Sequence, residues 1–201
     1  KNPKSNLAII TIDPSSPKSG GSILGDRIRM DELSIDKRVF IRPCPSQEAG
    51  GGVAYASRDI VLLLEYCAYD VIIIESIGVG QGEYEICNLV DMFIFLQMPE
   101  SGDVIQGIKK GILELADLIV VHKYDGVLKK SAQRSKQMLE MSLAKDSSDW
   151  SVPILCASSY ERKGIEVVWD KVNKFFQIQK KQILYFQLIQ FHIYLILKKH
   201  F

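Results

Sequence analysis

Five short runs of apolar residues, separated by longer stretches of helical character, most constrain the fold of this chain. The runs are rich in isoleucine and valine and are bounded by polar residues or glycine, which is typical of buried parallel strands. They are LAIITI from Leu7, DVIIIE from Asp70, MFIFLQM from Met92, DLIVVH from Asp117 and PILCAS from Pro153. The helix-like stretches cover residues 52–69, 103–115, 128–144 and 164–177. This order predicts an α/β fold, with a mostly parallel sheet covered by helices on both faces.

Composition limits the classes of function. The 201 residues are enough for one ordinary domain, and 47% of them are hydrophobic, which supports a packed core. The 25 basic and 24 acidic residues almost cancel, so the net charge gives no reason to expect binding to nucleic acid or to an anionic membrane. The four cysteines form no C-x-x-C pair, which argues against a zinc site or a disulfide framework. They are predicted to be reduced, intracellular and mostly in the core.

The two ends of the chain lead to further expectations. The chain begins with Lys1 rather than methionine and shows no basic, apolar leader, so we expect a fragment or a processed product without a signal peptide here. The apolar stretch from Gln182 is interrupted by glutamines and a histidine, which leaves it short of the roughly 20 apolar residues of a membrane-spanning helix. We expect a docked helix or an unrelated tail there.

Acidic residues stand at or near the predicted strand ends. Asp13 closes the first run, Glu75 closes the second, and Asp26 lies between them in SILGDR. Carboxylates at the carboxyl edge of a parallel sheet are suited to Mg²⁺, which neutralises the charged oxygens of a nucleoside triphosphate. Each of these acids could instead cap a helix or lie in a solvated turn.

A glycine-rich loop, SIGVGQGE, follows Glu75 directly and includes Gly78 and Gln81. An acid at a strand tip followed by glycine resembles a Walker B acid followed by the switch glycine that senses a γ-phosphate. The loop that cradles phosphates, G-x-x-x-x-G-K-[ST], does not occur in the 201 residues. We therefore interpret SIGVGQGE as a switch rather than as the phosphate cradle.

A possible base-reading motif follows the fourth run. VVHKYDG resembles the N-K-x-D motif of GTPases, whose aspartate accepts hydrogen bonds from the guanine ring nitrogen and exocyclic amine while the lysine stem packs on the base. Lys123 and Asp125 occupy the motif positions, and His122 replaces the asparagine. One strand later, CASSYERKG resembles the S-A loop that closes over guanine, with Ser158 at the serine position. The alternative is that HKYD is an ordinary turn.

Longer runs make the chain similar to the MeaB/ArgK family, over about residues 7–174. They are TIDPSSPKSGGSILGDRIRM, FIRPCPS, GGVA, DVIIIESIGVGQGE, GDVIQGIKKGILELADLIVVHKYDG and GIEVVW. The family includes the human protein of methylmalonic aciduria type A and the LAO/AO transport ATPases. Its members are SIMIBI-class P-loop GTPases that act as chaperones of adenosylcobalamin-dependent methylmalonyl-CoA mutase.

The resemblance implies particular ligands and site residues. GTP or GDP and Mg²⁺ would be bound, and the biological output would be cobalamin loading onto the mutase or protection of the mutase. The implied metal ligands are Asp13, Asp26 and Glu75. The implied base-reading residues are His122, Lys123, Asp125 and Ser158. The implied catalytic residues are Gly78 and Gln81 of switch II and Lys109 of switch III, the last assisting mutase-stimulated hydrolysis.

The resemblance also implies how the chain is organised. Residues 1–180 would be a partial GTPase domain of P-loop type lacking the first strand and the phosphate cradle, which would lie upstream, and residues 181–201 would be a divergent apolar tail. Without that first strand, we expect an exposed apolar sheet edge. A homodimer is implied for the full-length protein, with no nucleic-acid or membrane partner. The location would be cytoplasmic in a bacterium and the mitochondrial matrix in a eukaryote.

Two other functions remain open. A dinucleotide-dependent oxidoreductase would use GVGQG as its glycine loop, but G-x-G-x-x-G needs glycine where Glu83 stands, and such a loop should open the first βαβ unit. A titration with nicotinamide and guanine nucleotides would separate these two functions. A non-enzymatic partner-binding module would keep the switch surfaces without the cradle, and mutase binding without nucleotide turnover would favour it.

Overall fold

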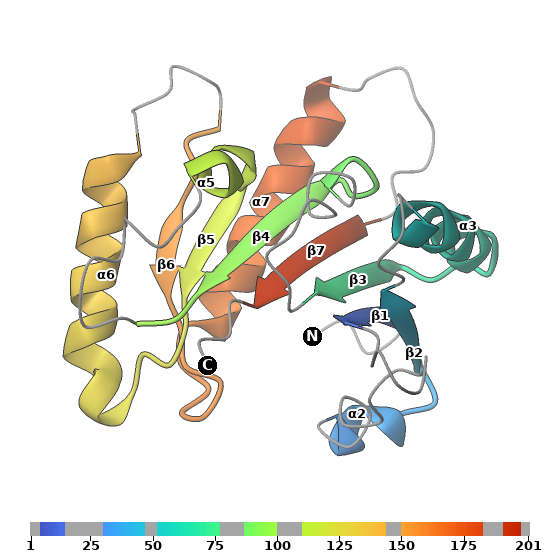
Figure 1. The fold of residues 1–201 in the computed structure, drawn as a ribbon, viewed down its shortest axis with the longest axis horizontal. Coiled ribbons are helices and arrows are strands. Elements are labelled where there is room, and N and C mark those ends of the chain that lie inside the picture. Colours follow the sequence, from blue (N-terminus) through green and yellow to red (C-terminus); the bar gives the residue numbers. More distant parts are fainter. Residues whose placement is uncertain are drawn as a thin grey trace. The chain divides into compact units, whose positions relative to one another are not determined.

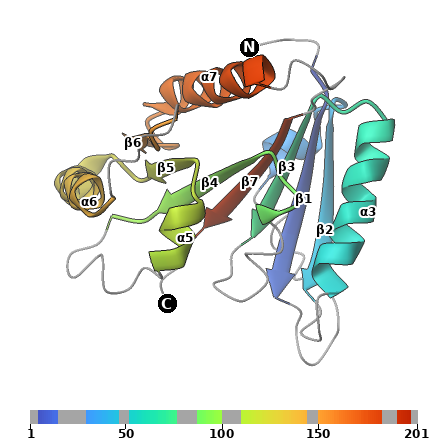
Figure 2. The same cartoon turned by 90° about the horizontal axis from the view of Figure 1, so that it is seen from above.

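The computed structural model describes residues 5–14, 30–46, 52–76, 87–99, 110–143, 150–182 and 191–197. The chain divides into two units, Lys1–Met92 with Gln190–Phe201 and Phe93–Ile189. Each unit contains parallel strands with helices packed beside them (Figures 1 and 2). The predicted α/β class is therefore confirmed, and each unit is described in turn.

The first unit contains parallel strands in the order β2-β1-β3-β7. β1 (Leu7–Pro14) and β3 (Val71–Ser76) were predicted, whereas β2 (Val39–Ser46) was not. Two prolines interrupt the apolar pattern of β2, but an edge strand tolerates proline where the missing N–H would face away from the sheet. The helices of this unit are α2 (Asp31–Ser34) and α3 (Gly52–Tyr66), and α3 packs against β2.

Of the two expectations for the C-terminal segment, a docked helix or an unrelated tail, the structure contradicts the helix for the residues that it describes. Phe191–Leu197 forms the strand β7, which runs parallel to β3, with Phe191 opposite Val71 and Ile196 opposite Ser76. The sequence FHIYLIL is rich in β-branched and aromatic residues, which favour a strand. The polar interruptions that argue against a membrane helix do not argue against a strand. Within the first unit β3 is therefore paired on both sides, with β1 and with β7.

The second unit contains parallel strands in the order β4-β5-β6, all three of which were predicted. They are β4 (Met92–Gln97), β5 (Leu118–Val121) and β6 (Ile154–Cys156). Helices α5 (Lys110–Leu115) and α7 (Ile165–Gln182) lie on opposite faces of these strands (Figure 2). The 3-10 turn η1 (Gly126–Leu128) leads into α6 (Lys129–Ser142), which packs beside β6.

Burial explains why the strand sequences are nearly continuous apolar runs. All four residues of β5 are buried, and so are the first four residues of β4. A strand covered on both faces cannot alternate apolar and polar residues. From α7, Phe175 and Phe176 enter the core, and the ring of Trp150 meets that of Phe175 edge-on at 5.2 Å.

The cysteines were expected to be reduced and mostly in the core. All four are free thiols, but Cys67 is exposed, and Cys44, Cys87 and Cys156 are only partly buried. The expectation of core positions was therefore wrong: Cys44 lies on the edge strand β2, Cys67 follows the end of α3, and Cys156 is the last residue of β6. Among the helices that the structure describes, none is long and apolar enough to cross a membrane.

Asp117 is a largely buried carboxyl group at the amino end of β5. Its Oδ2 accepts a hydrogen bond from the Phe93 N–H at 2.8 Å, and its backbone carbonyl accepts one from Trp150 Nε1 at 2.8 Å. Burial raises its pKa from 3.8 to about 6, although the hydrogen bond from Phe93 opposes the rise. The folded state therefore binds this proton more tightly than the unfolded chain. Its contribution to stability falls as the pH rises from about 4 to about 6.

We expect Asp117→Asn to remove this loss of stability. A pKa shift of roughly 2 units corresponds to about 3 kcal/mol. Urea unfolding of both proteins between pH 4 and 7 measures the effect, and the unfolding free energy of the variant minus that of the native chain should grow by up to this amount. A difference that stays constant across the range would contradict a raised pKa for Asp117.

Candidate functional site

Two loops of the second unit leave the carboxyl ends of neighbouring strands, where open α/β folds bind ligands. The loop 122–125 follows β5, and the loop 157–163 follows β6. The Tyr124 N–H donates to the Ala157 carbonyl at 3.0 Å, and the Ala157 N–H donates to the Val121 carbonyl at 3.0 Å. These backbone bonds hold the loops side by side. The sequence motifs that they carry therefore meet in one place.

The side chains of Asp125 and Ser158 join the two loops directly. Ser158 Oγ donates a short hydrogen bond to Asp125 Oδ2 and accepts one from the Glu161 N–H at 3.0 Å. Ser158 is fully buried, so its hydroxyl is held in a fixed environment. Among the described residues, no other side chain bonds the Asp125 carboxylate, which leaves Oδ1 able to accept from a ligand. The structure thus brings together two of the predicted base-reading residues.

The other two predicted base-reading residues begin the first loop. Lys123 has a φ of +55°, a left-handed conformation that few residues other than glycine adopt, and its side chain is exposed. Burial lowers the pKa of His122, and the charge of Lys123 lowers it further, so the imidazole is uncharged near neutral pH. Its Nε2 has no hydrogen-bond partner within the described part of the chain. A neutral imidazole offers one donor and one acceptor, so it retains part of the hydrogen-bonding capacity of the asparagine in the motif.

Gly164 closes the second loop, and sequence reasoning assigned no role to it. Ser158 and Lys163 exchange two backbone hydrogen bonds, of 2.9 and 3.0 Å, and Gly164 follows with a φ of +77°. A Cβ atom on Gly164 would lie 2.5 Å from the Cys156 carbonyl oxygen. The only sequence signal was a glycine immediately before a helical stretch. The close approach of Gly164 to β6 supports the loop that holds Ser158.

We expect Gly164→Ala to destabilise the chain by about 1 to 2 kcal/mol more than Gly126→Ala. Both glycines have positive φ, but an added Cβ on Gly126 meets nothing within 4 Å, whereas on Gly164 it meets backbone. The first variant therefore carries only the conformational cost, and the second also forces the loop to move. Urea unfolding of the two variants measures the difference. Equal costs would mean that the contact with Cys156 does not constrain the loop.

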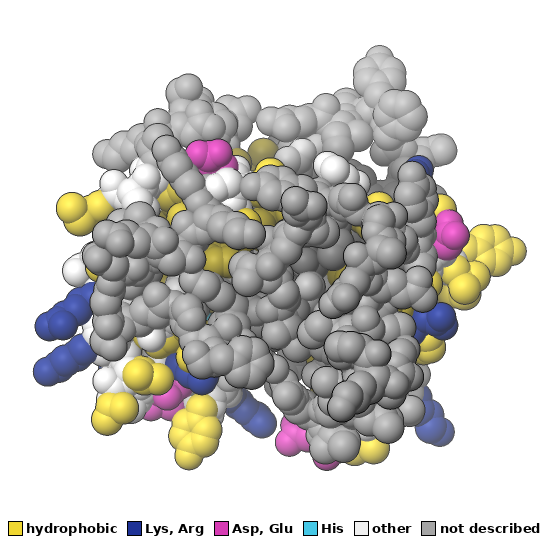
Figure 3. Space-filling view, in the orientation of Figure 1, with side chains coloured by type: hydrophobic (Ala, Val, Ile, Leu, Met, Phe, Trp, Pro, Cys, Tyr) yellow, Lys and Arg dark blue, Asp and Glu magenta, His cyan; other side chains and the backbone are white. Residues whose placement is uncertain are grey.

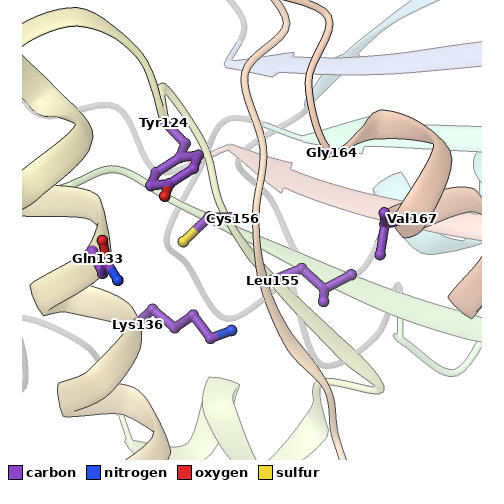
Figure 4. A pocket seen from close by; sticks show the side chains of 7 residues that line it. All are labelled: Tyr124, Gln133, Lys136, Leu155, Cys156, Gly164 and Val167. Atoms are coloured by element: carbon purple, nitrogen blue, oxygen red, sulfur yellow. The ribbon is translucent and has the colours of Figure 1, made fainter.

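A cavity of about 280 Å³ borders the loop 122–125 in the second unit. Figure 4 shows Tyr124, Lys136 and Cys156 around it. Asp125 and Ser158 do not line it, so it is separate from the pair that they form. Burial raises the pKa of the Cys156 thiol, which keeps it protonated and a poor nucleophile near neutral pH.

The predicted metal ligands belong to the first unit. Asp13 lies near the carboxyl end of β1 and Glu75 near that of β3, and these strands are neighbours with Thr11 opposite Glu75. Glu75 is partly buried, whereas only the backbone of Asp13 is described. Two acids on adjacent strand ends are compatible with Mg²⁺, which binds hard oxygen ligands. No group of three potential metal ligands is found among the described residues.

Four predicted site residues lie outside the described residues. They are Asp26 of the metal set and Gly78, Gln81 and Lys109 of the catalytic set. Their assignments remain predictions.

Comparison with known proteins shows which proteins this chain is similar to. A family model described as methylmalonyl Co-A mutase-associated GTPase MeaB matches residues 3–187. GTPase ArgK of Escherichia coli is 43% identical over 172 residues, which are 84% of this chain and 52% of that protein. The methylmalonic aciduria type A homolog, mitochondrial, of Mus musculus is 41% identical over 172 residues, covering 84% of this chain and 41% of that protein.

A solved structure has a similar fold. The crystal structure of LAO/AO transport system kinase matches with a TM-score of 0.70 and 33% sequence identity, over 89% of this chain and 51% of that one. The chain spans about half the length of these proteins or less. The matched model ends at residue 187, so β7 lies beyond it.

Proposed function

Because this chain belongs to the MeaB family of methylmalonyl-CoA mutase-associated GTPases, we propose that it binds a guanine nucleotide and takes part in Mg²⁺-dependent GTP hydrolysis. One observation carries the proposal, namely the hydrogen bond from Ser158 to Asp125 between loops that are already tied by their backbones. This bond fixes the orientation of a carboxylate at the carboxyl end of a parallel sheet. A fixed acceptor there suits a planar base with donors along one edge.

Guanine presents two adjacent donors, the ring N1–H and the exocyclic amine. Adenine has no hydrogen on N1, so it cannot offer the same pair to a carboxylate. Asp125 would accept from guanine, while the exposed Lys123 would lay its stem against the ring face. His122, uncharged near neutral pH, would supply one further hydrogen bond. Base selectivity thus follows from residues of the second unit.

The first unit would supply the metal ligands. Asp13 and Glu75, with Asp26, would hold Mg²⁺, and a bound Mg²⁺ would neutralise charge on the phosphate oxygens. Gly78 and Gln81 would respond to the γ-phosphate, and Lys109 would add a positive charge during hydrolysis. The partner would be adenosylcobalamin-dependent methylmalonyl-CoA mutase, which the protein would load with cobalamin or protect. We also propose a homodimer, located in the cytoplasm of a bacterium or in the mitochondrial matrix.

Nucleotide titration of a form of the protein that carries a phosphate cradle tests the base assignment. Fluorescent GDP, ADP and NADH analogues carry the same reporter group, and binding is followed by anisotropy. GDP should bind at least tenfold more tightly than ADP, because only guanine matches the Asp125 acceptor. Equal affinities for GDP and ADP, or tighter binding of NADH, would overturn the proposal. Mutase binding without any GTP turnover in a longer form would point to a non-enzymatic partner module.

We expect Glu75→Ala to reduce Mg²⁺-dependent GTP hydrolysis more than GDP binding. This experiment uses a form of the protein that carries a phosphate cradle. Glu75 would act on the metal beside the γ-phosphate, and GDP lacks that phosphate. Phosphate release and GDP titration give the two measurements. The control is Asp70→Ala, which removes a carboxylate just before the amino end of β3 and should leave the Mg²⁺ dependence unchanged. Equal losses of hydrolysis and GDP binding in Glu75→Ala would show that Glu75 only supports the fold.

A further inference from the structure

Thr11 carries a buried hydroxyl group on β1, close to the strand ends that carry the proposed metal ligands of the first unit. The residue is 1% exposed, and its Oγ1 has no hydrogen-bond partner among the described residues. A hydroxyl taken out of water without a partner opposes folding, because the hydrogen bonds that it made with water are not replaced. Valine has nearly the same shape, suits a strand equally well and lacks the hydroxyl. The strand alone therefore does not explain a threonine at this position.

The neighbours of Thr11 in the sheet offer it one described acceptor. Paired residues of adjacent parallel strands point to the same face of the sheet. On β2, Thr11 lies opposite Pro43, whose side chain forms no hydrogen bonds, and on β3 it lies opposite Glu75. Along β1, the apolar Ile9 stands two positions before Thr11, and Asp13, a predicted metal ligand, stands two positions after it. Of these neighbours with described side chains, only Glu75 could accept the hydroxyl proton.

We propose that Thr11 is a positioning residue for the metal site, whose hydroxyl donates a hydrogen bond to Glu75 when that carboxylate holds Mg²⁺. The inference rests on the proposed function, which makes Glu75 a ligand of Mg²⁺. A carboxylate has four lone-pair positions, so Glu75 can bind a metal ion and accept from Thr11 at the same time. Partners of this kind orient ligating carboxylates, and their loss typically weakens metal binding by about 10- to 100-fold. The buried hydroxyl would gain its partner when the metal binds.

Replacement of Thr11 by valine separates this role from a purely structural one. The probe is Mn²⁺, and the electron paramagnetic resonance signal of free Mn²⁺ measures its binding to the 201-residue chain. Thr11→Val should weaken Mn²⁺ binding by about tenfold or more, whereas Thr11→Ser, which keeps the hydroxyl, should retain most of the affinity. In the absence of added metal, Thr11→Val should be at least as stable in urea as the native chain, because the hydroxyl that it removes has no partner. A hydroxyl that only supports the fold would give the opposite result, a loss of stability with unchanged Mn²⁺ affinity.

A double-mutant cycle with Glu75 tests the pairing itself. Glu75→Gln should weaken Mn²⁺ binding, and adding Thr11→Val to it should cost less than about twofold more, because the carboxylate that the hydroxyl orients is already gone. Acidic side chains are also spread over the surface that Figure 3 shows, so weak binding to them must be separated from binding at the site. Asp170→Asn, which removes an exposed carboxylate from α7, supplies this control and should leave the affinity unchanged.

The outcomes distinguish this inference from the proposed function. Full Mn²⁺ affinity in Thr11→Val, equal losses in Thr11→Val and Thr11→Ser, or the same loss from Thr11→Val with and without Glu75→Gln would overturn the role of Thr11 and leave the metal assignment intact. Unchanged Mn²⁺ affinity in Glu75→Gln, or no saturable Mn²⁺ binding by the native chain, would overturn the metal assignment and the role of Thr11 together.

Discussion

Asp125→Asn is expected to weaken GDP binding by roughly 10- to 150-fold, in a form of the protein that carries a phosphate cradle. The variant replaces a carboxylate that accepts hydrogen bonds by an amide that presents a donor toward the guanine N1–H or amine. The lost charged hydrogen bond is worth about 1.5 to 3 kcal/mol, which corresponds to that range of affinity. Titration with a fluorescent GDP analogue measures the change.

A nucleotide whose base has different hydrogen-bond donors gives the Asp125→Asn experiment a second, more specific measurement. Xanthine has a carbonyl where guanine has its exocyclic amine, so it presents an acceptor that the new amide can satisfy. Asp125→Asn should therefore bind xanthosine diphosphate more tightly than the native chain does, while losing GDP. The matched control is Asp170→Asn, which removes the same charge from an exposed position on α7 and should change neither affinity. Unchanged GDP affinity in Asp125→Asn would exclude Asp125 as the base reader.

Ser158 holds the Asp125 carboxylate in a fixed orientation, and the size of the expected loss in Asp125→Asn depends on that orientation. Its hydroxyl donates to Asp125 and accepts from the Glu161 N–H, so both its donor and one acceptor position are already used within the loops. The carboxylate is thus oriented before a ligand arrives, which lowers the entropy lost on binding. A carboxylate in a mobile turn would be a weaker acceptor for a base.

The strands that could be predicted were those whose sequences are nearly continuous apolar runs. The runs that became β1, β3, β4, β5 and β6 are nearly continuous apolar segments, and such segments are recognisable without knowledge of their neighbours. β2 was missed because Pro43 and Pro45 resemble a loop until the strand is known to lie at an edge. β7 was missed because an apolar stretch of its length is ambiguous between helix and strand. Its identity depends on pairing with β3, a contact distant in sequence.

The residues of the candidate site also divide into those that a sequence pattern indicates and those that only the structure reveals. The resemblance to GTPase motifs singled out Lys123, Asp125 and Ser158, and the structure brings Asp125 and Ser158 together. Spacing could not identify Gly164, whose importance arises because an added Cβ atom would lie 2.5 Å from the Cys156 carbonyl oxygen. The lowered pKa of His122 was equally hidden, because it depends on burial. Residues that touch a ligand leave a sequence signal, whereas residues that support them become visible only in the packed structure.

GTP hydrolysis by residues 1–201 alone is expected to be at least about 100- to 1,000-fold slower than by a version extended upstream to include G-x-x-x-x-G-K-[ST]. Phosphoryl transfer depends on positioned donors, and the cradle supplies backbone N–H groups, a lysine and a metal-binding hydroxyl. Removal of one preorganised donor typically costs about 100- to 1,000-fold, so the absence of the whole set should cost at least as much.

Folding failure must be separated from catalytic failure in this comparison. In the structure β7 pairs with β3 in parallel, so β3 has strand neighbours on both sides within the chain. The 201-residue chain should therefore unfold cooperatively in urea and still lack turnover. Phosphate release by both proteins, at matched concentrations with Mg²⁺ and GTP, measures the difference. Comparable rates would show that SIGVGQGE binds phosphate by itself and is not only a switch. Retained folding with lost turnover would instead separate the scaffold, which the 201 residues provide, from the phosphate chemistry, which requires the cradle.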